Sequence, residues 1–133
     1  MNLRFSACVL GCALFVVGCG PSGPELYSVK GEVKYDSQPL ATGDIIFEPT
    51  DSEGAASGGA ITQGKYSIKA LPGKYKVKIN ASREIPGKMI PGPSGGEIAA
   101  REDYIPAKFN TKTELTAEVD SEPENTINFE MAK

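Results

Sequence analysis

The chain has 133 residues, with 14 Lys and Arg against 17 Asp and Glu, and it contains neither His nor Trp. The missing His excludes a Ser-His-Asp triad, a Cys-His pair and any His-ligated zinc or iron. The formal net charge of -3 gives no electrostatic basis for binding nucleic acid, and the 40% hydrophobic and 23% charged content is typical of a folded protein with one domain.

The N-terminal segment 1–18 has the pattern of a secretory signal. Arg4 supplies a short basic start, and the run 5–18 (FSACVLGCALFVVG) that follows carries no charge. This run is too short to span a bilayer, which needs about 20 apolar residues. We therefore expect segment 1–18 to be a signal peptide that is cleaved off.

The apolar run ends in four residues that resemble a bacterial lipobox: Val16, Val17, Gly18 and Cys19. The resemblance implies cleavage before Cys19 and a diacylglycerol on its sulfur, and two or three acyl chains give stable membrane attachment. Cys8 and Cys12 lie in the removed peptide, so no disulfide is expected. Gly20 stands where an Asp would retain the lipoprotein in the inner membrane, which favours the outer membrane.

Residues 19–28 are expected to form the lipidated Cys and a flexible tether, because GPSGPELYS is rich in Gly, Pro and Ser. The remainder, 29–133, is expected to be one domain. Its first strand is predicted at 29–35, where apolar and polar residues alternate, followed by a turn at 36–39. Residues 74–81 alternate three Lys with an inward-facing apolar set.

Further strands are predicted at 43–48, 60–62, 65–70, 115–119 and 127–131. Gln63-Gly64 is typical of a two-residue hairpin turn between two of them. With about seven strands and no convincing helix, the pattern predicts an all-β fold, an antiparallel Greek-key β-sandwich.

Segment 82–103 departs from this pattern. It holds three Pro and four Gly with little periodicity, so we predict a long loop there, and loops of that length are either functional or disordered. Apolar side chains in the loop and just after it make it the candidate interaction site: Ile85, Met89, Ile90, Ile98 and Tyr104. The alternative is an ordinary insertion that packs loosely on one edge of the sandwich.

Several short motifs resemble the carboxypeptidase regulatory-like domain: Gly31-Glu32-Val33, Pro39-Leu40, Gly43-Asp44-Ile45-Ile46-Phe47, Gly64-Lys65-Tyr66 and 71–77 (LPGKYKV). The resemblance implies a transthyretin-like sandwich that serves as an accessory module. The enzymes that resemble this fold, hydroxyisourate hydrolases and intradiol dioxygenases, use His, which this chain lacks. We therefore expect no catalytic residue and no cofactor. We also expect no metal, because acidic clusters such as Asp51-Ser52-Glu53 match no calcium loop.

These observations predict a membrane-anchored, non-catalytic lipoprotein of the cell envelope, held by the lipid on Cys19, with its domain in the periplasm or outside the cell. Its expected partner is an unknown envelope protein or glycan, although only Tyr27 and Tyr104 are expected to be free of the core for stacking on a sugar. The alternative is a structural spacer or assembly component of the envelope. A hydrolase would have to rely on carboxylates or Lys alone.

Overall fold

The structure is a computed structural model that describes residues 20, 23–51 and 54–133. The predicted signal peptide and the lipobox residues Val16, Val17, Gly18 and Cys19 lie outside the described residues. Within the described ranges, no helix has the length and the apolar character needed to cross a membrane.

The all-β prediction is confirmed. Eleven strands are described, several of them short, together with a 3-10 helix, η1 (Ala107–Phe109). The strands are β1 (Tyr27–Tyr35), β2 (Gln38–Pro39), β3 (Thr42–Pro49), β4 (Ser57–Thr62), β5 (Lys65–Ala70), β6 (Gly73–Asn80), β7 (Ser82–Pro91), β8 (Glu97–Asp103), β9 (Thr116–Val119), β10 (Glu124–Thr126) and β11 (Phe129–Met131). Because β1 begins at Tyr27, it includes the last two residues of the predicted tether.

One curled sheet holds nine of these strands, in the order β10-β1-β5-β4-β3-β6-β9, with β2 and β11 also paired to β1. Most neighbours are antiparallel, but β1 runs parallel to both β10 and β11, so the prediction of a purely antiparallel sheet is wrong at this edge. After β9, which pairs with β6 at one end of the sheet, the chain crosses to the other end, where β10 and β11 run alongside β1 in the same direction.

The core lies inside the curl of this sheet. Alternate residues of β6 are buried, as the pattern at 74–81 predicts, and those of β3 and β5 face them. The Phe47 ring, from β3, lies 5.7 Å from Tyr75 of β6 and 6.1 Å from Phe129 of β11, centroid to centroid. Aromatic side chains from separate strands therefore meet at the centre of the domain.

Tight turns fix the register of the sheet. The two-residue hairpin turn predicted at Gln63-Gly64 is confirmed, since Thr62 pairs with Lys65, and both turn residues have positive φ angles, 51° and 74°, as in a type I′ turn. Asp36 and Ser37 form a second turn of this kind between β1 and β2, with φ angles of 54° and 65°. The turn predicted at 36–39 is thus confirmed, and it uses Asp-Ser without any Gly.

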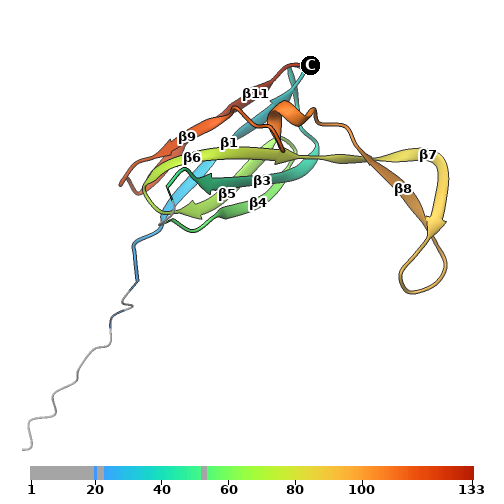
Figure 1. Cartoon of the computed structure of the whole chain (residues 1–133), viewed down its shortest axis with the longest axis horizontal. Helices are drawn as coiled ribbons and strands as arrows, with labels where there is room; N and C mark the ends of the chain where they lie inside the picture. The colour runs from blue at the N-terminus through green and yellow to red at the C-terminus, as the bar shows by residue number, and fades with distance from the viewer. Residues whose placement is uncertain (1–19, 21–22, 52–53) are drawn as a thin grey trace, which may run out of the picture.

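The prediction of a long loop at 82–103 is wrong, because β7 and β8 pair into a two-stranded antiparallel sheet of their own. This hairpin extends away from the curled nine-stranded sheet (Figure 1). Its Pro and Gly residues lie in two irregular parts of the hairpin, a bulge in β7 and the turn between β7 and β8. Pro86 and Gly87 lie in a bulge, where Gly87 has a φ of 73°, and the others lie at or beside the tip. The Pro and Gly content suggested a loop because the paired segments of the two strands are only three residues long on each side of the bulge.

Candidate functional site

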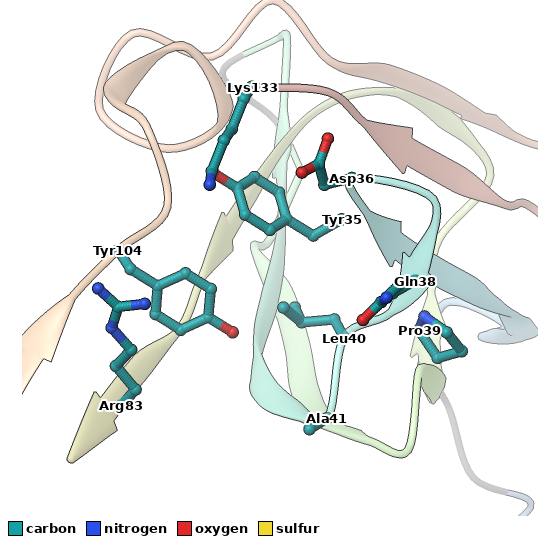
Figure 2. Close-up of a pocket in the computed structure, with 9 residues that line it drawn as sticks. All are labelled: Tyr35, Asp36, Gln38, Pro39, Leu40, Ala41, Arg83, Tyr104 and Lys133. Carbon is teal, nitrogen blue, oxygen red and sulfur yellow. The ribbon is translucent and has the colours of Figure 1, made fainter. Parts of the chain in front are cut away.

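A cavity of about 510 Å³ lies where the hairpin leaves the sandwich. We call it the base pocket. Its sandwich side comes from the end of β1 and the segment after it: Tyr35, Asp36, Gln38, Pro39, Leu40 and Ala41. The lining is completed by Arg83 of β7, by Tyr104, which directly follows β8, and by Lys133 (Figure 2). We call the side formed by Arg83 and Tyr104 the hairpin side. The volume lies within the roughly 300–1,000 Å³ that is usual for small-molecule sites.

Backbone hydrogen bonds hold the sandwich side of the base pocket in place. The Asp36 N–H donates to the Met131 carbonyl at 2.7 Å, which ties the β1–β2 turn to β11. Leu40 is buried, and its N–H donates to the Val33 carbonyl at 3.0 Å. The pocket therefore has a rigid floor, which reduces the entropy lost when a ligand binds.

The hairpin side is ordered by a chain of side-chain contacts. The Arg83 Nε donates to a Glu102 carboxylate oxygen at 2.8 Å, and the Arg83 guanidinium lies 5.4 Å from the centroid of the Tyr104 ring. The Tyr104 ring meets Tyr35 edge to face, with centroids 5.8 Å apart and planes at 65°. This aromatic pair joins the hairpin to the sandwich.

The predicted interaction residues separate into two groups. Tyr104 lines the base pocket and is partly buried against the core, so the expectation that it is free of the core is wrong, and the same holds for Tyr27. Ile85 lies half-buried in the bulge of β7. The remaining three face solvent further along the hairpin, with exposed fractions of 51% for Met89, 39% for Ile90 and 48% for Ile98.

The exposed apolar residues occupy both faces of the hairpin. Ile90 pairs directly with Ile98 across the two strands, and Met89 pairs with Ala99. Because successive side chains of a strand point to opposite faces, Met89 and Ile90 lie on different faces. The side chains of Met89, Ile90 and Ile98 are exposed, and no third described strand pairs with β7 or β8.

Sequence reasoning missed most of the base pocket. The alternation at 29–35 predicts a strand but gives Tyr35 no further role, and Arg83 and Lys133 belong to no pattern in the sequence. The tight turn at 36–39 was the one available signal, because it marks a place where a strand end and its side chains come to the surface.

No group of three or more Cys, Asp or Glu side chains in the described ranges could hold a metal ion.

No protein-family model matches this chain, and the search of curated proteins finds no match. Among solved structures, the chain is similar to a 9R-lipoxygenase from Cyanothece, at 9% sequence identity and a TM-score of 0.46, over 81% of this chain and 16% of that chain. The chain therefore spans only a small part of the length of that protein.

Proposed function

We propose that this protein is a lipid-anchored, non-catalytic module of a bacterial cell envelope that binds a partner through its β7–β8 hairpin and the base pocket. The observation that carries the binding role is the pair of apolar faces on the hairpin, at Met89, Ile90 and Ile98. Apolar groups held out on a projection lose contact with water only when another surface covers them, so such patches mark interaction sites.

The anchor is proposed from the sequence. The lipobox-like residues 16–19 follow an apolar run, and β1 begins at Tyr27, which leaves seven residues, 20–26, between Cys19 and the first strand. Seven extended residues reach at most about 25 Å. The domain would therefore stay close to the membrane surface, most simply that of the outer membrane.

The finer fold is part of the same proposal: a transthyretin-like Greek-key sandwich of the carboxypeptidase regulatory-like type. It is supported by the contacts of Phe47 with Tyr66 on β5 and Phe129 on β11, two strands that do not pair with β3, because such contacts are expected across a sandwich core. It is also supported by Gly31, at which an added Cβ would overlap the Ile127 carbonyl group. A glycine in the first motif of the resemblance thus has a packing reason.

Photo-crosslinking in the native envelope tests the binding role. A photoreactive amino acid at Met89 is expected to form a covalent adduct with a partner. The matched control places it at Leu26, which is 53% exposed but lies outside the hairpin. A discrete adduct at position 89 and none at position 26 supports the proposal. No adduct at either position would contradict it and favour the structural spacer.

The anchor is tested separately. Cys19→Ala is expected to move the protein from the membrane fraction to the soluble fraction, because the acyl chains are lost. Cys12→Ala is the matched control, because that residue lies in the peptide that is removed. A Cys19→Ala protein that stays in the membrane fraction would overturn the lipoprotein assignment and leave the hairpin result unaffected.

A further inference from the structure

We infer that the base pocket is a saccharide site, which takes a neutral, polyhydroxylated ligand between Tyr104 on the hairpin side and Tyr35, Gln38 and Leu40 on the sandwich side. The inference rests on the proposed function, because it names the class of ligand for an envelope-binding module. It differs from the sequence-based expectation, in which few aromatic residues were available to a glycan.

The five tyrosines of the chain divide into three whose hydroxyls donate a hydrogen bond and two whose hydroxyls do not. The Tyr27 hydroxyl donates to a Glu25 carboxylate oxygen at 3.0 Å. The hydroxyls of Tyr66 and Tyr75 donate to the carbonyls of Ile127 at 2.7 Å and Leu71 at 2.8 Å, so they are already satisfied within the sandwich. The hydroxyls of Tyr35 and Tyr104 form no hydrogen bond with any residue in the described part of the chain, and both rings line the base pocket. They combine an apolar ring with an unused polar group, which suits the alternating C–H and O–H groups of a sugar.

Polar side chains of both hydrogen-bonding types surround these rings. The Gln38 amide supplies donors and an acceptor, Asp36 supplies acceptors, and Lys133 supplies donors. Figure 2 shows the Tyr104 hydroxyl directed from the hairpin toward Leu40 and Gln38. An apolar floor with a few convergent polar groups is the usual composition of a small-molecule site.

The charges of the base pocket favour a neutral ligand. Arg83 and Lys133 would repel a cation, while Asp36 and the Glu102 that pairs with Arg83 would repel an anion. Arg83 is also held over the Tyr104 ring, so its guanidinium is committed to positioning that ring. The pocket therefore carries charges of both signs. A hydroxyl group can donate a hydrogen bond to the carboxylates and accept one from Lys133, so it suits both kinds of side chain.

The backbone around the pocket argues against an extended peptide. A peptide that adds to a sheet needs free N–H and C=O groups along an edge. Here the carbonyls of Leu40 and Ala41 accept from Gly64 at 2.7 Å and Gln63 at 2.8 Å, and Pro39 has no N–H to donate. Recognition at this surface therefore falls to side chains, as expected for a small polar ligand.

The test measures binding of three soluble oligosaccharides, chitohexaose, cellohexaose and maltohexaose, to the full chain in a zwitterionic detergent without a sugar headgroup. Saturation-transfer NMR reports which sugar protons lie against the protein, and titration gives the affinity. We expect at least one of the three to bind. Tyr104→Ala is expected to weaken it by roughly tenfold or more, because the stacking surface is lost.

Matched variants locate the site. Tyr104→Phe keeps the ring and should lose less affinity than Tyr104→Ala, and Gln38→Ala, at an exposed position, should weaken binding without affecting folding. Tyr27→Ala removes a partly buried tyrosine outside the pocket, and Ile98→Ser alters the hairpin faces, so both should keep wild-type affinity. Circular dichroism confirms that each variant is folded.

Two results would overturn the inference. If none of the three oligosaccharides binds, the ligand class is wrong. If a sugar binds but folded Tyr104→Phe and Gln38→Ala both keep wild-type affinity, the site lies elsewhere. Neither result alters the crosslinking expected at Met89, so the failure of this inference is distinguishable from the failure of the proposed function.

Discussion

The curled nine-stranded sheet and the β7–β8 hairpin are built from the same kind of element but held together in different ways. In the curled sheet, side chains from separate strands converge on one core around Phe47. The hairpin is a sheet of two strands that does not enclose a core of its own, and its side chains Ile90 and Ile98 remain exposed at the surface. A hairpin alone is marginally stable in water. The difference indicates a scaffold that provides stability and a projection that is available for contact.

The largest contrast should come from removing one large apolar side chain in each region. Phe47→Ala is expected to lower the free energy of unfolding by about 3–5 kcal/mol, because it leaves a cavity among three packed rings. Ile98→Ala, at a half-exposed position, should cost less than about 1 kcal/mol. Urea unfolding measures both. Similar losses would mean that the hairpin is packed as tightly as the core.

A second contrast uses one glycine from each region. Gly31→Ala is expected to cost roughly 3 kcal/mol, because the new Cβ would lie 2.7 Å from the Ile127 carbonyl carbon, and that backbone is held by the Ile127 N–H bond to the Lys30 carbonyl. Gly87→Ala meets no atom within 4 Å, so only its φ of 73° is strained, at about 1 kcal/mol. Thermal denaturation measures which variant is less stable. A larger loss of stability for Gly87→Ala than for Gly31→Ala would contradict the close approach of Ile127 to β1.

A third contrast is in pH dependence. Burial raises the pKa of Tyr66 in the folded protein, because the phenolate is disfavoured away from water. The unfolded chain therefore loses this proton first as the pH rises, and stability falls above about pH 10. Tyr66→Phe should flatten that fall, measured by urea unfolding between pH 8 and 11. The remaining slope comes partly from Tyr75, whose pKa burial also raises. An unchanged slope would contradict the burial of Tyr66.

The smallest effect is expected from the ion pairs of the hairpin. Arg101 donates to Glu84 at 3.3 Å and to the Ser82 hydroxyl and carbonyl at 3.1 and 3.0 Å, all at the surface. Arg101→Ala should change the global free energy of unfolding by less than about 0.5 kcal/mol. It should nevertheless speed hydrogen exchange in β7 and β8 while leaving β3 and β6 unchanged. Faster exchange throughout the domain would show that the hairpin and sandwich unfold as one unit.

Much of the sandwich could be predicted because its signals are local. The alternation in β6 and the Gln63-Gly64 turn depend on residues next to one another in the chain, and both are confirmed. The hairpin could not be predicted in this way. Its ladder segments are interrupted by Pro86 and Gly87, and pairing of Arg83 with Glu102 joins residues 19 apart. The base pocket joins residues much further apart, so no local pattern contains it.

The sequence by itself determined the all-β class, the positions of most core strands and the tight turns, because each depends on side-chain alternation or on backbone conformations set within a few residues. It also carries the lipobox-like segment on which the proposed anchor rests. Only the tertiary structure decided that β10 and β11 lie parallel to β1, that 82–103 is a hairpin, and that Tyr35 and Tyr104 meet. The physical reason is that each depends on contacts between distant parts of the chain, which form only when the sheet curls around its core.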